Sequence, residues 1–115
     1  MIEIRQYVDR AGRNAFERWF EKLDEGVQAR VTVYLDRLER GNSGSVKAIG
    51  GMLSELRLDF GPGYRVYFGW DGEKVVILLA GGTKRRQPAD IQRARALWAE
   101  YLARKEEQNG ADEEL

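Results

Sequence analysis

Residues 53–70 read L-S-E-L-R-L-D-F-G-P-G-Y-R-V-Y-F-G-W, and the rest of the chain is best interpreted around them. Residues 53–60 and 64–70 alternate apolar and polar side chains, which is typical of strands whose two faces meet different surroundings. The glycines and proline at 61–63 predict a tight turn between them. The stretch therefore predicts an antiparallel hairpin.

This hairpin has two chemically different faces. If residues 61–63 form a three-residue loop, the expected cross-strand pairs are Phe60 with Tyr64, Asp59 with Arg65, Leu58 with Val66, and Arg57 with Tyr67. The apolar members lie on one face, which we expect to reach the core. The opposite face carries Glu55, Arg57, Asp59, Arg65, Tyr67 and Gly69. We expect that second face to be open to solvent.

The flanking sequence predicts an α+β fold. Residues 2–8 alternate like a strand, and residues 74–80 form the apolar run typical of a central strand covered on both faces. Residues 41–51 are rich in glycine and serine and are expected to form a flexible loop that carries Lys47. Apolar residues at helical spacing predict three helices, over residues 14–23, 27–40 and 88–105. The expected order is β-α-α-β-β-β-α, with a small, mostly antiparallel sheet packed on a helical hairpin.

Composition limits the chemistry. The chain has 115 residues, enough for one domain, and contains no cysteine and no histidine. Disulfides, thiolate metal sites and the commonest general base near neutral pH are therefore excluded. We expect no metal and no other cofactor, and chemistry that uses Lys, Arg, Tyr, Asp or Glu. The longest apolar run is far shorter than the ~20 residues that span a bilayer, so we expect a cytoplasmic protein without membrane contact.

Charge is unevenly distributed although the net charge is zero. Residues 41–95 hold nine basic and five acidic side chains, and residues 105–115 hold one basic and five acidic ones. We expect a domain over residues 1–105 and an acidic, disordered tail over 106–115. An ordinary solvated tail explains the acidic end better than any function does.

The basic residues near the end of the last strand suggest a polyanionic ligand. In an antiparallel meander, Lys84, Arg85 and Arg86 are expected beside Arg65. Arginine pairs bidentately with phosphate, and Tyr67 on the same face would stack on an unpaired base, worth ~1–3 kcal/mol. The alternative is an ordinary surface, with a cross-strand ion pair worth about 0–1 kcal/mol and a solvated basic loop.

The combination of motifs resembles one known family. It consists of Glu55-Leu56-Arg57, the run from Gly61 to Phe68, Leu78-Leu79, Gly81-Gly82, Lys84, Gln87 and Asp90-Ile91. This set resembles the RelE/ParE toxin superfamily, especially its HigB-like branch of addiction module killer and phage Gp49-like proteins. The resemblance covers nearly all of residues 1–104. It departs at residues 83–86, where T-K-R-R replaces the acidic residue before the lysine and the small polar residues after it that this branch more often shows.

The resemblance implies a toxin that is neutralised by an antitoxin encoded beside it, expected to be a small helix-turn-helix protein. Many relatives cleave mRNA in the ribosomal A site, whereas ParE-like members poison DNA gyrase. For an RNase, the expected catalytic residues are Arg57, Arg65, Tyr67 and Lys84. The expected RNA-binding residues are Lys47, Arg85, Arg86 and Gln87. We expect a metal-independent cleavage in which the 2′-hydroxyl of the RNA attacks the adjacent phosphorus. A gyrase inhibitor without catalysis, or a diverged RNA-binding domain, remains an alternative.

Overall fold

The computed structural model describes residues 1–113, with side chains described up to residue 110. Within this part the elements are β1 (Glu3–Gln6), α1 (Ala15–Glu21), α2 (Glu25–Glu39), β2 (Val46–Gly50), β3 (Leu53–Leu58), β4 (Tyr64–Asp71), β5 (Val75–Thr83), a 3₁₀ turn η1 (Lys84–Arg86) and α3 (Gln87–Glu113). The predicted α+β class is confirmed. No helix in this part of the chain combines the length and apolar character needed to cross a bilayer.

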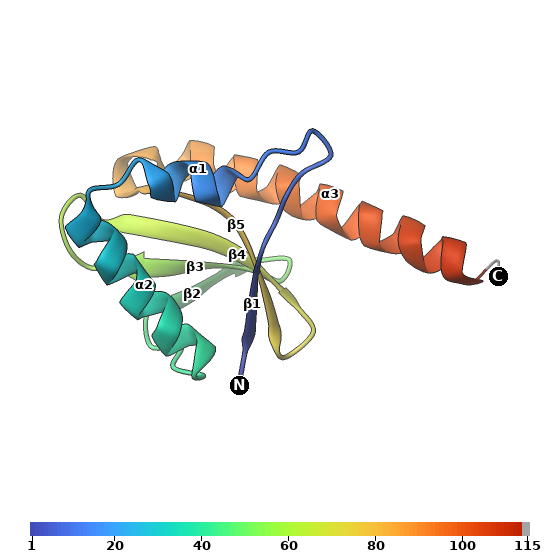
Figure 1. Cartoon of the computed structure of the whole chain (residues 1–115), viewed down its shortest axis with the longest axis horizontal. Helices are drawn as coiled ribbons and strands as arrows, with labels where there is room; N and C mark the ends of the chain where they lie inside the picture. Colours follow the sequence, from blue (N-terminus) through green and yellow to red (C-terminus); the bar gives the residue numbers. More distant parts are fainter. Residues whose placement is uncertain (114–115) are drawn as a thin grey trace.

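The strands form one sheet in the order β1-β5-β4-β3-β2 (Figure 1). β1 runs parallel to β5, and the other neighbours are antiparallel. Helices α1 and α2 cover one face through Phe16, Val31 and Leu38. Helix α3 covers the other face through Ala94 and Trp98. Strand β5 is therefore buried on both sides, as its continuous apolar run predicted.

Two glycines allow the helices to approach the sheet closely. A Cβ atom at Gly69 would lie 2.4 Å from the ring of Trp98 on α3. A Cβ atom at Gly81 would lie 2.2 Å from the ring of Trp19 on α1. Both distances are far below van der Waals contact, so each tryptophan rests directly on the strand backbone. The two rings lie on opposite faces of the sheet.

Helix ends follow the local sequence. Asn14 caps α1, because its side chain accepts a hydrogen bond from the backbone N–H of Glu17 at 3.0 Å. Gly41 follows α2 with a φ of 89°, a left-handed conformation that glycine adopts at little cost.

The prediction of a flexible loop over residues 41–51 is wrong for its second half. Residues 46–50 form β2, an edge strand paired with β3. An edge strand needs little apolar surface, and here only Val46 and Ile49 are half-buried. The glycines on either side of this short segment concealed its alternation.

The predicted register of the hairpin is also wrong, by two residues. Leu58 pairs with Tyr64 and Arg57 pairs with Arg65, because the loop spans residues 59–63 rather than 61–63. A shift of two residues leaves every side chain on its predicted face, since side chains alternate with a period of two.

The expectation that the polar face of the hairpin is open to solvent is wrong for most of its length. Helix α3 packs on it, so Glu55 and Tyr67 are completely buried. The apolar spacing that predicted this helix places Ala94 and Trp98 against the sheet, where both are buried, whereas Leu102 is 45% exposed.

Helix α3 is longer than the sequence predicts. It continues past Lys105 to Glu113, so residues 106–113 of the expected disordered tail are helical. Its last turns extend beyond the rest of the molecule (Figure 1). Residues 114–115 of the expected tail lie outside the described part of the chain.

Candidate RNA-binding site

Four of the predicted site residues come from neighbouring elements at one end of the sheet. Arg57 and Arg65 are cross-strand partners on β3 and β4. Lys47 on β2 pairs with Glu55, two positions before Arg57. Lys84 follows β5, and its backbone N–H donates to the carbonyl oxygen of Gly63 at 2.8 Å. We call Lys47, Arg57, Arg65 and Lys84 the basic patch. The predicted proximity of Lys84 to Arg65 is confirmed.

The hairpin loop forms a hollow at this patch. It has a volume of about 420 Å³ and is lined by residues 59–63 together with Arg65 and Lys84. A Cβ atom at Gly63 would lie 3.2 Å from Cβ of Lys84 and 3.4 Å from a guanidinium nitrogen of Arg65. The φ of 74° at Gly63 also favours glycine. The loop backbone thus lies close to both cations.

Arg65 is a nearly buried cation with few partners. Its residue is 7% exposed, its Nη1 donates to the carbonyl oxygen of Tyr64 at 3.2 Å, and its Nε is buried without a hydrogen-bond partner. A buried guanidinium is costly unless an anion compensates for it. No ion pair within residues 1–110 includes Arg65, which leaves it available for an external anion.

Glu55 supports the patch from beneath. Its buried carboxylate accepts hydrogen bonds from Nε of Arg57 at 2.9 Å and from Nε2 of Gln87 at 2.6 Å. The first contact orients Arg57, whose side chain keeps 38% exposure. The second anchors the start of α3. Gln87, expected to contact RNA, is therefore engaged inside the protein.

Tyr67 is not a surface residue. Its ring is fully buried under α3, and its hydroxyl has no hydrogen-bond partner. Burial, and then the charges of Glu55 and Asp90, raise the pKa of Tyr67 to about 12. In this arrangement the phenol neither stacks on a base nor exchanges a proton with a bound strand.

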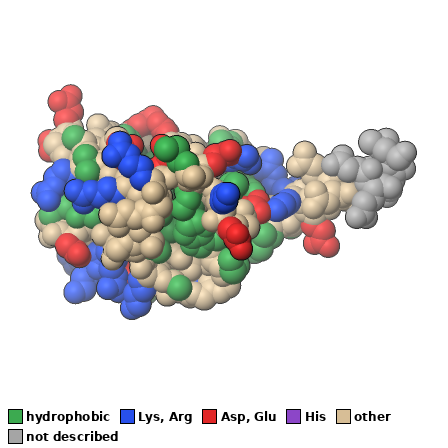
Figure 2. Space-filling view, turned by 90° about the horizontal axis from the view of Figure 1, so that it is seen from below, with side chains coloured by type: hydrophobic (Ala, Val, Ile, Leu, Met, Phe, Trp, Pro, Cys, Tyr) green, Lys and Arg blue, Asp and Glu red, His purple; other side chains and the backbone are tan. Residues whose placement is uncertain are grey.

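The basic residues after β5 point to two different places. Lys84 lines the hairpin hollow, whereas Nε of Arg86 lies 4.0 Å from Oδ1 of Asp90 on the other side of η1. Arg85 is exposed. The predicted cluster of Lys84, Arg85 and Arg86 beside Arg65 is therefore divided. Lys and Arg side chains gather at the end of the molecule away from the projecting part of α3 (Figure 2).

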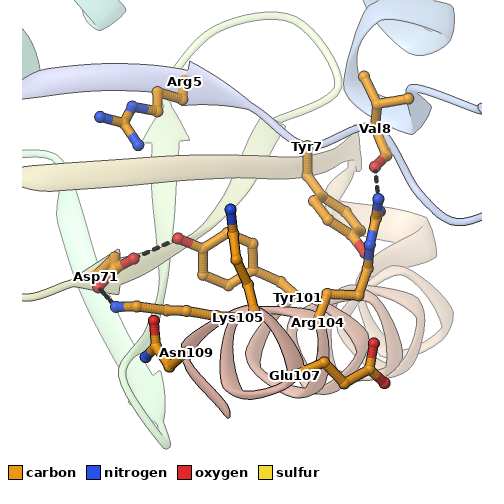
Figure 3. A pocket seen from close by; sticks show the side chains of 10 residues that line it. Arg5, Tyr7, Val8, Asp71, Tyr101, Arg104, Lys105, Glu107 and Asn109 are labelled. Atoms are coloured by element: carbon orange, nitrogen blue, oxygen red, sulfur yellow. Dashed lines mark hydrogen bonds and ion pairs between the residues drawn. The ribbon is translucent and has the colours of Figure 1, made fainter. Parts of the chain in front are cut away.

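A larger hollow lies elsewhere, between β1 and the second half of α3 (Figure 3). It has a volume of about 820 Å³, but its charged groups are engaged in contacts within the protein. Asp71 accepts hydrogen bonds from Tyr101 and, at 2.5 Å, from Lys105, and Arg104 donates to the carbonyl oxygen of Val8 at 2.9 Å. The hydrogen bond from Lys105, and then the one from Tyr101, lower the pKa of Asp71. These contacts fasten α3 to the sheet, and no sequence motif indicated them.

Glu55 and Asp90 are the polar residues whose roles sequence reasoning missed. A carboxylate placed among buried positions of a strand was the available signal for Glu55, because such a group needs partners in the fold. Asp90 was named only among the motifs that carry the family resemblance, whereas the structure shows it 7% exposed and against Gly82.

Comparison of the sequence with known proteins identifies its family. Residues 18–99 match the family described as "Phage derived protein Gp49-like (DUF891)". The chain is also 40% identical over 83 residues to an uncharacterized protein of Haemophilus influenzae, an alignment that covers 71% of this chain and 84% of the relative. The chain therefore belongs to the Gp49-like phage-derived protein family, within the RelE and addiction-module killer branch.

Proposed function

We propose that this chain is the toxin of a type II toxin–antitoxin pair and that it cleaves mRNA bound to the ribosome. The observation that supports this function best is the pairing of Arg57 with Arg65 across adjacent strands, with Lys84 beside Arg65 at the same hollow. Like charges opposite one another destabilise a sheet. Glu55 neutralises only Arg57, so the position favours an anion such as a phosphodiester.

The proposed reaction uses the RNA as its own nucleophile. The 2′-oxygen attacks the adjacent phosphorus, the bond to the 5′-oxygen breaks, and a 2′,3′-cyclic phosphate and a 5′-hydroxyl remain. Arg57 and Arg65 bind the phosphate oxygens and stabilise the charge that grows on them, usually the largest catalytic contribution. Lys84 transfers a proton to or from the reacting oxygens.

This site predicts an enzyme that depends on its substrate being positioned. The chain has no histidine, and Tyr67 is buried with a raised pKa, so no group near the patch is a well-matched general base at neutral pH. Cleavage of free RNA is expected to be slow. A ribosome that holds the mRNA in a reactive geometry would supply the missing rate.

The antitoxin is proposed to inhibit the toxin by covering the basic patch. A small helix-turn-helix protein with an acidic segment has the required charge. Such a segment would compete with RNA for Arg57 and Lys84, whose side chains are accessible.

The test is a translation extract in which cleavage of a defined mRNA is mapped by primer extension. The wild-type chain is expected to produce discrete cuts, and Arg57→Ala is expected to remove them. Arg37→Ala, which removes an exposed arginine from α2, serves as the control and should cut normally. Intact mRNA at toxin concentrations that stop growth would refute the RNase. Inhibition of DNA supercoiling by the same sample would instead favour the gyrase alternative.

A further inference from the structure

A second cationic hollow lies between α1 and α3, beside the last residues of β5. We call it the α1–α3 groove, and its volume is about 360 Å³. Its basic side chains are Arg18, Lys22, Arg86 and Arg93, which come from three different elements. None of them belongs to the proposed catalytic group.

The groove exists because β1 is shorter than β5. The last residue of β1, Gln6, pairs with Leu78, whereas β5 continues to Thr83. Beyond Leu78, β5 has β4 on one side and no strand of the described chain on the other. Of this stretch, Gly81, Gly82 and Thr83 line the groove, and the Thr83 hydroxyl is a hydrogen-bond donor there.

The charges in the groove are poorly balanced. Asp90 is its one acidic residue among those described, and Oδ1 of Asp90 lies 4.0 Å from Nε of Arg86. Arg18, Lys22 and Arg93 take part in no ion pair within residues 1–110. Four cations against one carboxylate leave an excess of three positive charges around a concave floor. Such a surface attracts anions and suits the tetrahedral oxygens of a phosphate.

The groove and the basic patch are neighbours. Lys84 of the patch and Arg86 of the groove belong to η1, a single 3₁₀ turn about 6 Å long. Gly82, which lines the groove, is the cross-strand partner of Arg65. The two sites therefore share the last residues of β5 and the turn that follows them.

We propose that the α1–α3 groove binds a phosphate of the RNA strand flanking the nucleotide held at the basic patch. This inference rests on the function proposed above and extends its substrate contact to residues outside the catalytic group. The cations recognise the backbone rather than a base edge, so the groove contributes affinity and strand direction without sequence preference.

The test measures binding of a short fluorescent single-stranded RNA whose 2′-hydroxyls are methylated, so that it cannot be cleaved. Fluorescence anisotropy over a salt series gives the slope of log Kd against log salt. Each lost phosphate contact lowers this slope by about 0.7 for a single strand. The double variant Arg18→Ala/Arg93→Ala is expected to lower it by about 0.7, because the groove is proposed to hold one phosphate. All variants are checked by thermal unfolding, and exposed substitutions should leave the melting temperature unchanged.

The matched control is Arg37→Ala/Arg40→Ala, which removes the same charge from exposed positions at the end of α2. It should change the slope by less than about 0.3, because it removes no direct contact. Equal effects of the two double variants would reduce the groove to a contribution of net charge and overturn the inference. No effect of Arg18→Ala/Arg93→Ala would overturn it as well.

Arg57→Ala in the same assay separates this inference from the proposed function. If Arg57→Ala weakens RNA binding and the groove variant does not, the inference fails and the catalytic site stands. If only the groove variant weakens RNA binding and mRNA stays intact in the translation extract, the proposed function fails. The proposal that the groove and the basic patch bind one RNA strand then fails as well. Absence of RNA binding by the wild-type chain would overturn this inference, whereas the proposed function is decided by cleavage in the translation extract.

Discussion

Replacing Glu55 by glutamine tests whether one buried carboxylate organises both the basic patch and the start of α3. The carboxylate accepts hydrogen bonds from Arg57 and Gln87, at 2.9 and 2.6 Å. Glutamine has a single acceptor oxygen, and its amide N–H₂ would face one of the two donors. Glu55→Gln should therefore break one of the two hydrogen bonds.

The expected cost follows from burial. A hydrogen bond to a charged group contributes about 1.5–3 kcal/mol. The ion pair adds no more than about 1 kcal/mol, because the Arg57 side chain is 38% exposed and partly hydrated. Removing the charge also relieves the desolvation cost of a fully buried carboxylate, which offsets part of the loss. We expect the free energy of unfolding to fall by about 2 kcal/mol and the melting temperature by roughly 8 °C.

Urea unfolding followed by circular dichroism measures this loss. Glu21→Gln, an exposed position on α1, is the control and should stay within about 0.5 kcal/mol of the wild-type value. Combining Glu55→Gln with Arg57→Ala closes a double-mutant cycle, in which the coupling between the two residues should exceed about 0.5 kcal/mol. Wild-type stability of Glu55→Gln, or additive effects in the cycle, would show that this carboxylate does not organise the patch.

Three further changes probe the sheet and its coverings. Gly69→Ala places a Cβ 2.4 Å from the Trp98 ring and should lower the free energy of unfolding in urea by about 3 kcal/mol. Gly110→Ala, whose Cβ would have no atom within 4 Å, should stabilise α3 by about 1 kcal/mol. Similar effects at both sites would argue against the close contact. Tyr67→Phe removes a buried hydroxyl without a hydrogen-bond partner, so the free energy of unfolding should be unchanged or rise by about 1 kcal/mol. Cleavage of mRNA in the extract should persist. Loss of cleavage in a folded variant would show that this tyrosine takes part in the reaction. The pKa of Asp71 is lower in the folded chain than in the unfolded one, so its contribution to stability is present above about pH 4 and disappears as the pH falls through the folded pKa. Asp71→Asn should therefore flatten the acid side of a plot of unfolding free energy against pH. An unchanged curve would count against the interaction.

The faces of the central hairpin could be predicted from the sequence, but its register could not. Alternation assigns Leu56 and Arg57 to opposite faces for any loop length. An error of an even number of residues in the predicted loop also leaves their cross-strand partners on the predicted faces. Loop length depends on the backbone conformation of residues 59–63, in which Gly61 and Gly63 adopt positive φ angles of 54° and 74°. A glycine-proline-glycine motif is compatible with both three- and five-residue loops.

The position of α3 was the main limit on predicting the site. Its apolar stripe predicted a buried face, but periodicity does not say which surface receives that face. The answer depends on contacts distant in sequence, such as Trp98 with Gly69 and Gln87 with Glu55. The cationic residues Arg57, Arg65 and Lys84 could be selected from composition and strand order alone. The burial of Tyr67 could not, because it follows from where the helix packs.

The two tryptophans that rest on glycine backbones give the molecule a pair of internal optical probes. The indole of Trp19 reports contact between α1 and the sheet, and the indole of Trp98 reports contact between α3 and the opposite face. Single-tryptophan versions of the chain would therefore resolve, by fluorescence, whether the covering of one face loosens before the other. The same fluorescence would show whether the proposed antitoxin acts by masking the basic patch, which adjoins the start of α3, or by displacing that helix.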